Sequence, residues 1–123
     1  MLGTAKLAGF IGTTKPAEAR EFYEKKLGLT FVEDSEFAIL FDSNGTRLRV
    51  QKVREVPDIQ YTALGWNVTG IEKVIDDLKA NGVKFEHYPW MPDPDSDVMA
   101  FEGGAKVAWF KDPDGNILSL DEY

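Results

Sequence analysis

The sequence contains no cysteine and only one histidine, His87. Without cysteine, disulfide bonds, thiolate metal sites and cysteine nucleophiles are all excluded. A single histidine also rules out a two-histidine, one-carboxylate iron site within one chain, and a symmetric dimer that pools two chains has only one histidine per site. The commonest transition-metal centres therefore lack their ligands.

Long apolar runs are missing as well. No segment approaches the about 20 residues needed to cross a bilayer, and the N-terminus lacks the apolar stretch of a signal peptide. We expect a cytoplasmic protein on these grounds. The formal net charge is -7, and the 14 Lys and Arg residues are dispersed along the chain. Because an acidic chain repels phosphate backbones and anionic lipids, we expect no nucleic-acid partner and no membrane partner.

Hydrophobic periodicity predicts the same order of elements in both halves of the chain. The first half predicts strands over 7–12, 30–33, 37–41 and 46–53, with a helix over 16–27 after the first strand. The second half predicts strands over 61–68, 83–88, 106–110 and 116–120, with a helix whose apolar residues lie at 71, 74, 75 and 78. Thr69 and Glu72 have capping-box spacing, and Asn81-Gly82 is a stop signal. This order predicts an α+β fold: one domain, 1–123, of two βαβββ modules at about 1–57 and 58–123.

The two halves match at two different offsets. Gly82 lies 54 residues after Gly28, whereas the turn Asp112-Pro113-Asp114-Gly115 lies 70 residues after Asp42-Ser43-Asn44-Gly45. The difference is an insertion of 16 residues in the second half. It falls between the strands predicted at 83–88 and 106–110, from about Pro89 to Gly104.

Three segments carry a family resemblance: REFYEKKLGLTF at 20–31, GWNVTGIEKVIDDLKANGVKFE at 65–86 and VAWFKDPDGNILSL at 107–120. In this order they resemble the vicinal oxygen chelate superfamily of glyoxalases, bleomycin-resistance proteins and ring-cleaving dioxygenases. The resemblance implies two curved four-stranded sheets that together form a cleft for a divalent metal. It also implies metal ligands on the first and last strand of each module, and assembly as a homodimer.

The metal-ligand positions that the resemblance implies are Ala8 and Ala63 on the first strands, and Arg49 and Ser119 on the last strands. Two methyl groups, a permanent cation and a hydroxyl do not bind a dication at neutral pH. We therefore expect no metal and no cofactor. The single histidine also argues against dioxygenase and fosfomycin-resistance chemistry, which in this superfamily use paired histidines.

Several side chains are candidates for ligand binding in the implied cleft. Arg47 and Arg49 alternate with apolar residues, so both are expected on one face, where they would clamp an organic anion or, alternatively, form an exposed strand edge or an ion pair with a local Glu. Gln51 follows on the same face as a displaced ligand. His87 is either a proton shuttle or metal ligand, or simply a partly exposed strand residue.

Aromatic and thioether side chains are concentrated in the second half. We expect Trp66 and Trp109 in the core, although Trp109 is also a candidate for the wall of the cleft. Trp90, Met91 and Met99 lie in the insertion, which suggests a lid over an apolar pocket. Asp93, Asp95 and Asp97 resemble the start of a calcium loop. However, Val98 replaces its glycine and Gly104 its final glutamate, so an exposed acidic loop is expected.

Three functions are compatible with this sequence. The first is binding of a small organic molecule, aromatic or apolar, without a catalytic metal, as in the family's drug-binding resistance proteins. The second is a lyase or isomerase similar to glyoxalase I, with ligands at non-family positions such as Gln51, Glu86 or His87. The third is a regulatory or partner-binding protein whose cleft is filled by its own side chains. The candidate ligand-binding residues are Arg47, Arg49, Gln51, His87, Trp90, Met91, Met99, Trp109 and Ser119.

Overall fold

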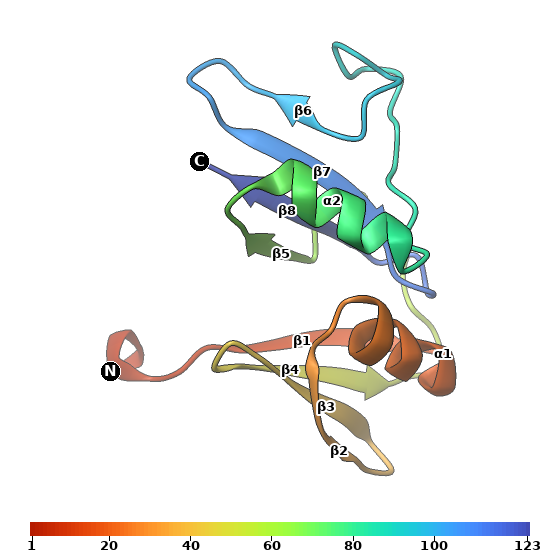
Figure 1. Cartoon of the computed structure of the whole chain (residues 1–123). Helices are drawn as coiled ribbons and strands as arrows, with labels where there is room; N and C mark the ends of the chain where they lie inside the picture. The colour runs from red at the N-terminus through yellow and green to blue at the C-terminus, as the bar shows by residue number, and fades with distance from the viewer. The chain divides into compact units, whose positions relative to one another are not determined.

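The computed structural model describes all residues, 1–123, and the chain divides into two compact units, Met1–Asp58 and Ile59–Tyr123. Each unit contains one four-stranded sheet and a helical segment (Figure 1). The predicted α+β class of two tandem modules is therefore confirmed. No helix has the length and apolar character that crossing a membrane requires.

The first unit begins with a short 3-10 turn, Leu2–Thr4, followed by β1 (Ala8–Thr13), α1 (Pro16–Glu21), β2 (Thr30–Asp34), β3 (Ala38–Ser43) and β4 (Thr46–Lys52). The sheet order is β1-β4-β3-β2, with β1 parallel to β4 and the other pairs antiparallel. Helix α1 continues into a π-helical turn, Phe22–Lys26, which places two consecutive aromatic residues, Phe22 and Tyr23, in the core. The helix predicted over 16–27 is thus present in two parts. Gly28, at φ +79°, follows it as the left-handed residue that ends it.

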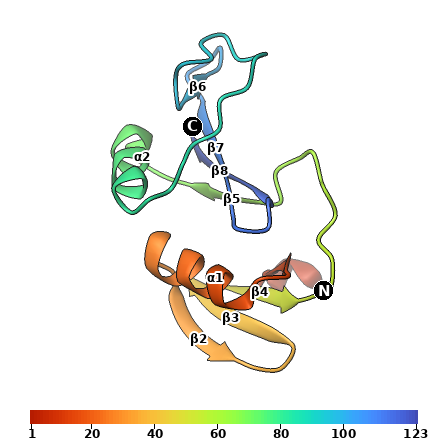
Figure 2. The same ribbon diagram turned by 90° about the vertical axis from the view of Figure 1, so that its right-hand side faces the viewer.

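The second unit consists of β5 (Leu64–Asn67), α2 (Ile71–Ala80), β6 (Met99–Ala100), β7 (Lys106–Lys111) and β8 (Ile117–Glu122), in the sheet order β5-β8-β7-β6. Its pairing repeats that of the first unit, because β5 is parallel to β8 while β7 is antiparallel to β8 and β6. Helix α2 lies across one face of this sheet, seen edge-on in Figure 2. Leu118 and Leu120 of β8 and Phe110 of β7 are buried on that face.

The predicted strand over 83–88 is wrong. Phe85 forms a single bridge with Phe110, and the Glu86 N–H donates to the Trp109 carbonyl at 2.8 Å. The chain then leaves the sheet and returns as β6, where Met99 pairs with Val107. The outer edge of β7 is therefore paired with two short segments, one at Phe85 and one at β6. Residues 87–98 leave the sheet between these segments and form the teal loop beside β6 in Figure 1.

The predicted capping box at Thr69 and Glu72 is also wrong. The residue before α2 is Gly70, in the left-handed conformation, and no side chain near it in sequence caps the helix. Instead, the carboxylate of Glu122 on β8 accepts hydrogen bonds from the backbone N–H of Gly70 at 2.6 Å and of Ile71 at 3.2 Å. The cap comes from the end of the chain, while the Glu72 carboxylate pairs with Lys106 on β7.

Candidate functional site

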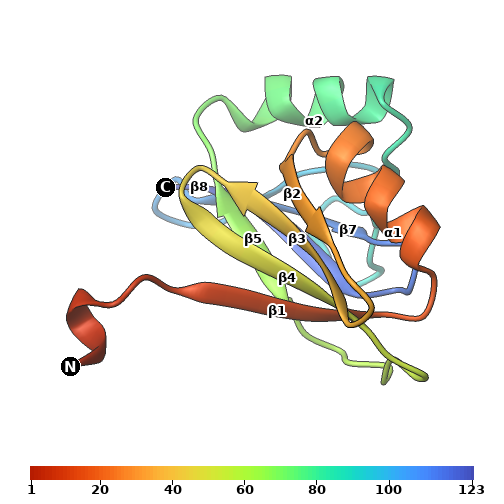
Figure 3. The same cartoon turned by 90° about the horizontal axis from the view of Figure 1, so that it is seen from below.

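The sheet face of the first unit that lies opposite α1 carries the two arginines. Leu48 and Val50 of β4 are buried toward the helix, so Arg47, Arg49 and Gln51 alternate onto the opposite face. Strand β4 runs in the middle of the sheet, between β1 and β3, which Figure 3 shows side by side with it. The predicted common face for the three side chains is confirmed, and the alternative of an exposed strand edge is wrong.

Apolar residues flank Arg49 on both neighbouring strands, whereas Arg47 has an alanine on one side and an acidic residue on the other. Arg49 lies between Phe10 of β1 and Leu40 of β3, and Arg47 between Ala8 and Asp42. No ion pair or side-chain hydrogen bond involves either guanidinium, so the alternative of an ion pair with a local Glu is wrong too. The nearest acidic residue in register, Asp42, instead accepts the backbone N–H of Gly45 at 3.2 Å in the β3–β4 turn.

In the second unit, the face opposite α2 carries Ser119 and Trp109. These residues are paired in the β7–β8 ladder, and Ser119 also pairs with Gly65 on β5. The Trp109 indole N–H donates to the Thr62 hydroxyl at 3.2 Å. Trp66 points to the other face, where it stacks on Phe110 with ring centroids 6.4 Å apart. Trp66 packs on the helix side but is only partly buried, whereas Trp109 is partly exposed on the opposite face, where the expectation of a core position is wrong.

An aromatic cluster of Tyr88, Trp90 and Trp109 covers part of this face. Tyr88 and Trp90 are stacked, with centroids 5.4 Å apart and planes at 10°. The Trp109 ring meets both edge-on, at 5.9 and 5.7 Å. Burial, and then the neighbouring Glu86 carboxylate, raise the pKa of the Tyr88 phenol. Trp90 nevertheless remains 61% exposed, so the cluster presents a large aromatic surface to solvent.

The two methionines of the insertion have different environments. Met91 is buried, and its sulfur accepts the backbone N–H of Tyr88 at 3.3 Å, so it anchors the chain beneath the aromatic pair. Met99 begins the edge strand β6. The insertion thus contributes an edge strand to the sheet. It is not one continuous loop over a pocket, as the placement of Met99 in a lid would require.

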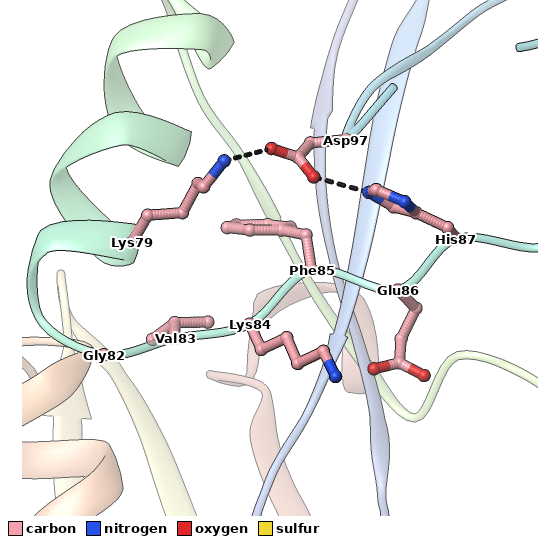
Figure 4. Close-up of a pocket in the computed structure, with 8 residues that line it drawn as sticks. All are labelled: Lys79, Gly82, Val83, Lys84, Phe85, Glu86, His87 and Asp97. Carbon is pink, nitrogen blue, oxygen red and sulfur yellow. Dashed lines mark hydrogen bonds and ion pairs between the residues drawn. The ribbon is translucent and has the colours of Figure 1, made fainter. Parts of the chain in front are cut away.

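A pocket of about 680 Å³ lies beside the C-terminal end of α2, lined by Lys79, residues 82–87 and Asp97 (Figure 4). The Asp97 carboxylate accepts from Lys79 Nζ at 2.7 Å and lies 2.6 Å from His87 Nε2. Burial opposes ionisation of Asp97, but the hydrogen bonds from Lys79 and His87 outweigh it and lower the pKa of the carboxyl group. The same hydrogen bond to Asp97 raises the pKa of Lys79.

The Asp97 bridge corrects two predictions. Asp93 and Asp95 are exposed, as expected of an acidic loop, but Asp97 is mostly covered and bonded on both carboxylate oxygens. His87 is exposed but does not belong to a strand. The sequence does not reveal this bridge, because Asp97 within the insertion meets His87 before the insertion and Lys79 at the end of α2. These contacts depend on the path of a loop, which no residue spacing indicates.

The four positions that the resemblance assigns to metal ligands lie on the faces opposite the helices. Ala8 and Ala63 are exposed, and Ser119 is buried against β5, where a Cβ on Gly65 would lie 2.8 Å from its hydroxyl oxygen. Of the alternative ligands, His87 is bonded to Asp97 and Glu86 lies 3.7 Å from Lys111 Nζ. No group of three or more His, Asp and Glu side chains is arranged to hold a metal ion.

Comparison with known proteins identifies relatives over nearly the whole chain. "Uncharacterized protein YraH" of Bacillus subtilis (strain 168) is 28% identical over 115 residues, covering 81% of this chain and 84% of that protein. A superfamily member from Sphaerobacter thermophilus DSM 20745 has a similar fold, with a TM-score of 0.75, 19% identity and full coverage of both chains. A lactoylglutathione lyase from Agrobacterium tumefaciens also has a TM-score of 0.75, at 15% identity, covering 97% of this chain and 93% of that one.

The sequence model of one family matches residues 7–120 and thus includes both modules and the insertion. It agrees with the repeated strand pairing of the two units and with the solved structures of similar fold. The chain belongs to the Glyoxalase/Bleomycin resistance protein/Dioxygenase superfamily.

Proposed function

We propose that the protein binds a small aromatic or apolar organic molecule without a catalytic metal. The observation that carries this proposal is the aromatic cluster of Tyr88, Trp90 and Trp109 on the sheet face opposite α2. A largely exposed indole stacked on a phenol ring leaves apolar surface in water, which a planar ligand would cover. The ordered arrangement of the cluster supports a preformed surface, because Trp109 is fixed by Thr62 and Tyr88 by Met91.

The residues at the family's metal-ligand positions do not fit a divalent metal. Two alanines supply no electron pair, and the Arg49 guanidinium would repel the ion. The hydroxyl of Ser119 is a weak ligand and is packed against β5. A lyase like the structurally similar lactoylglutathione lyase would need ligands elsewhere, and the pairing of His87 with Asp97 and of Glu86 with Lys111 weighs against it.

Calorimetric titration with planar aromatic compounds tests the binding proposal. We expect saturable binding at one site per chain, weakened roughly fivefold by Trp90→Ala, since stacking on an aromatic face contributes about 1 kcal/mol. Trp66→Phe is the matched control, because Trp66 packs on the α2 side of the sheet. Equal loss in both variants, or no binding of any compound, would contradict the proposal; the second result would favour a regulatory protein that binds no small molecule.

Metal analysis tests the second part of the proposal. We expect less than about one tenth of an equivalent of nickel, zinc, manganese or iron after gentle purification, and no gain of thermal stability when these ions are added. One tightly held equivalent, with a stability gain abolished by Gln51→Ala, Glu86→Ala or His87→Ala, would instead establish the lyase or isomerase alternative. We further propose a cytoplasmic homodimer, which light scattering after gel filtration and cell fractionation test separately.

A further inference from the structure

We infer that residues 83–87 pair, edge to edge, with the same residues of a second copy of this chain. This pairing rests on the homodimer proposed above and assigns its interface. The surface is an edge of the second sheet, beside the C-terminal end of α2, and not one of the two sheet faces.

The backbone of this segment is bonded on one side only. On its inner side, Phe85 bridges to Phe110 and the Glu86 N–H donates to the Trp109 carbonyl at 2.8 Å. In an antiparallel ladder, alternate residues direct both backbone groups to the same neighbour, so Phe85 and His87 direct theirs outward. Neither residue has a backbone hydrogen bond in the structure. The segment therefore presents unpaired donors and acceptors along its outer side.

The pocket of about 680 Å³ beside α2 follows this outer side. Its lining includes every residue from 82 to 87. Figure 4 shows Phe85 on one side of the segment and Lys84 and Glu86 on the other. Because the pocket contacts residues that point to both sides, it has to extend along the backbone between them. The unpaired edge thus has open space beside it for an added strand.

The sequence of the segment, VKFEH, is complementary to itself. When two copies are placed antiparallel about Phe85, Lys84 lies opposite the partner's Glu86, and Glu86 opposite the partner's Lys84. Phe85 then pairs with the partner's Phe85, and His87 with the partner's Val83. These are the hydrogen-bonded pairs of the ladder, and they use the backbone groups that point outward. Opposite charges directly across two antiparallel strands stabilise the pairing.

Charge favours a second copy over an unrelated extended peptide. Lys84 is exposed and has no ion pair, although acidic residues outnumber basic ones by 21 to 14. Glu86 has only Lys111, at 3.7 Å. A matching strand must therefore present an acidic residue opposite Lys84 and a basic residue opposite Glu86, and the segment itself meets this requirement. A ladder of five residues is a small interface, so we expect a weak dimer that depends on concentration.

Sedimentation velocity of the full chain between about 1 μM and 1 mM tests this interface. We expect a dimer that Lys84→Glu and Glu86→Lys each weaken roughly ten- to hundredfold, because each variant places two like-charged pairs across the interface. An equimolar mixture of the two variants should dimerise again, since each supplies the charges that the other lacks. The double variant Lys84→Glu/Glu86→Lys should also dimerise. Recovery in the mixture shows that both single variants are folded.

Lys6→Glu is the matched control, because Lys6 is an exposed lysine of the first unit without an ion pair and its replacement changes the net charge by the same amount. Amide hydrogen exchange gives an independent measurement. The N–H of His87 should become protected as the dimer forms, whereas that of Glu86, which is bonded within the chain, should be protected at every concentration.

Two results would overturn the interface and leave the homodimer: a dimer that both single variants leave intact, or one that Lys6→Glu weakens as much as Lys84→Glu does. A chain that stays monomeric up to about 1 mM would overturn the interface and the homodimer together, and would leave the edge to a different occupant such as an extended peptide. Aromatic binding is measured separately by calorimetry, so its failure is distinguishable from either result.

Discussion

Replacement of Asp97 by Asn should loosen the insertion of the second module. The Asp97 carboxylate joins two parts of the chain, Lys79 at the end of α2 and His87 where the chain leaves the sheet. Asn retains the shape of the side chain but removes its charge and one of its two acceptor oxygens. Both charge-assisted bonds are therefore weakened or lost, while the packing of the backbone around residue 97 is preserved.

The size of the effect follows from the exposure of the partners. The side chains of Lys79 and His87 are 52% and 40% exposed, so solvent screens both interactions. The exposed ion pair with Lys79 contributes about 0.2–1 kcal/mol and the screened hydrogen bond with His87 a similar amount, which gives about 0.4–2 kcal/mol for the two together. For a chain of this length such a loss lowers the melting temperature by roughly 2–8 °C.

The effect should depend on pH in a defined direction. Because the pKa of Asp97 is lowered in the folded state, its contribution to stability is complete above the unfolded value of about 3.9 and is lost as the pH falls through the folded value. The difference in stability between wild type and Asp97→Asn should therefore become smaller as the pH falls into the acid range.

Urea unfolding followed by tryptophan fluorescence measures the difference, and amide hydrogen exchange shows whether residues 87–98 exchange faster. Asp95→Asn is the matched control, because Asp95 lies two residues away, is exposed, forms no ion pair and carries the same charge. Equal stabilities of the two variants at neutral pH would refute the view that Asp97 anchors the insertion.

Three further predictions concern stability in the second module. Glu122→Ala should destabilise the protein by about 1 kcal/mol in thermal unfolding, because the start of α2 loses the carboxylate that caps it. Removal of a carboxylate that does not contact a helix should leave the stability unchanged. Gly65→Ala should destabilise the protein by about 1–3 kcal/mol, because its Cβ clashes with the Ser119 hydroxyl. Adding Ser119→Ala should restore most of the lost stability. If stability is not restored, the close approach of β5 and β8 is not the cause. Burial raises the pKa of the Tyr88 phenol, so the contribution of this neutral side chain to folding stability is complete below about pH 10 and is lost as the pH rises further. In urea titrations at alkaline pH, the stability of Tyr88→Phe should therefore fall less than that of wild type.

The sheet-forming segments were predictable because their patterns have a single physical interpretation. Along β4, apolar residues alternate with Arg47, Arg49 and Gln51, and only a strand with one covered face accommodates that alternation. Asp112 begins a tight turn between β7 and β8, and its carboxylate accepts the backbone N–H of Asp114 and Asn116. Because these hydrogen bonds are local, the turn can be predicted from its sequence without knowledge of the fold.

The edge of the second sheet was not predictable from the same signals. Val83 and Phe85 alternate with Lys84 and Glu86, which indicates a half-buried strand, and both apolar residues are indeed buried. Alternation indicates which side chains are buried, however, and not which strands pair. Only one bridge forms there, and Met99, within the insertion, completes the edge of the sheet. The cap of α2 by Glu122 was hidden for a related reason, because a contact between residues about 50 positions apart leaves no local pattern.

The interrupted edge strand explains how the second module holds its aromatic surface in place. A break in an edge strand costs hydrogen bonds on one side only, since the other side has no neighbour, so an insertion is least destabilising there. The chain on either side of residues 87–98 remains tied to β7 through Phe85 and Met99, and residues 87–98 are held by the buried Met91 and by the bonds of Asp97. Four attachments within about 15 residues favour a fixed wall over a lid that swings open. Ligand binding at this face should then need no slow opening step, and hydrogen exchange of residues 87–98 should change little when a ligand occupies the aromatic cluster.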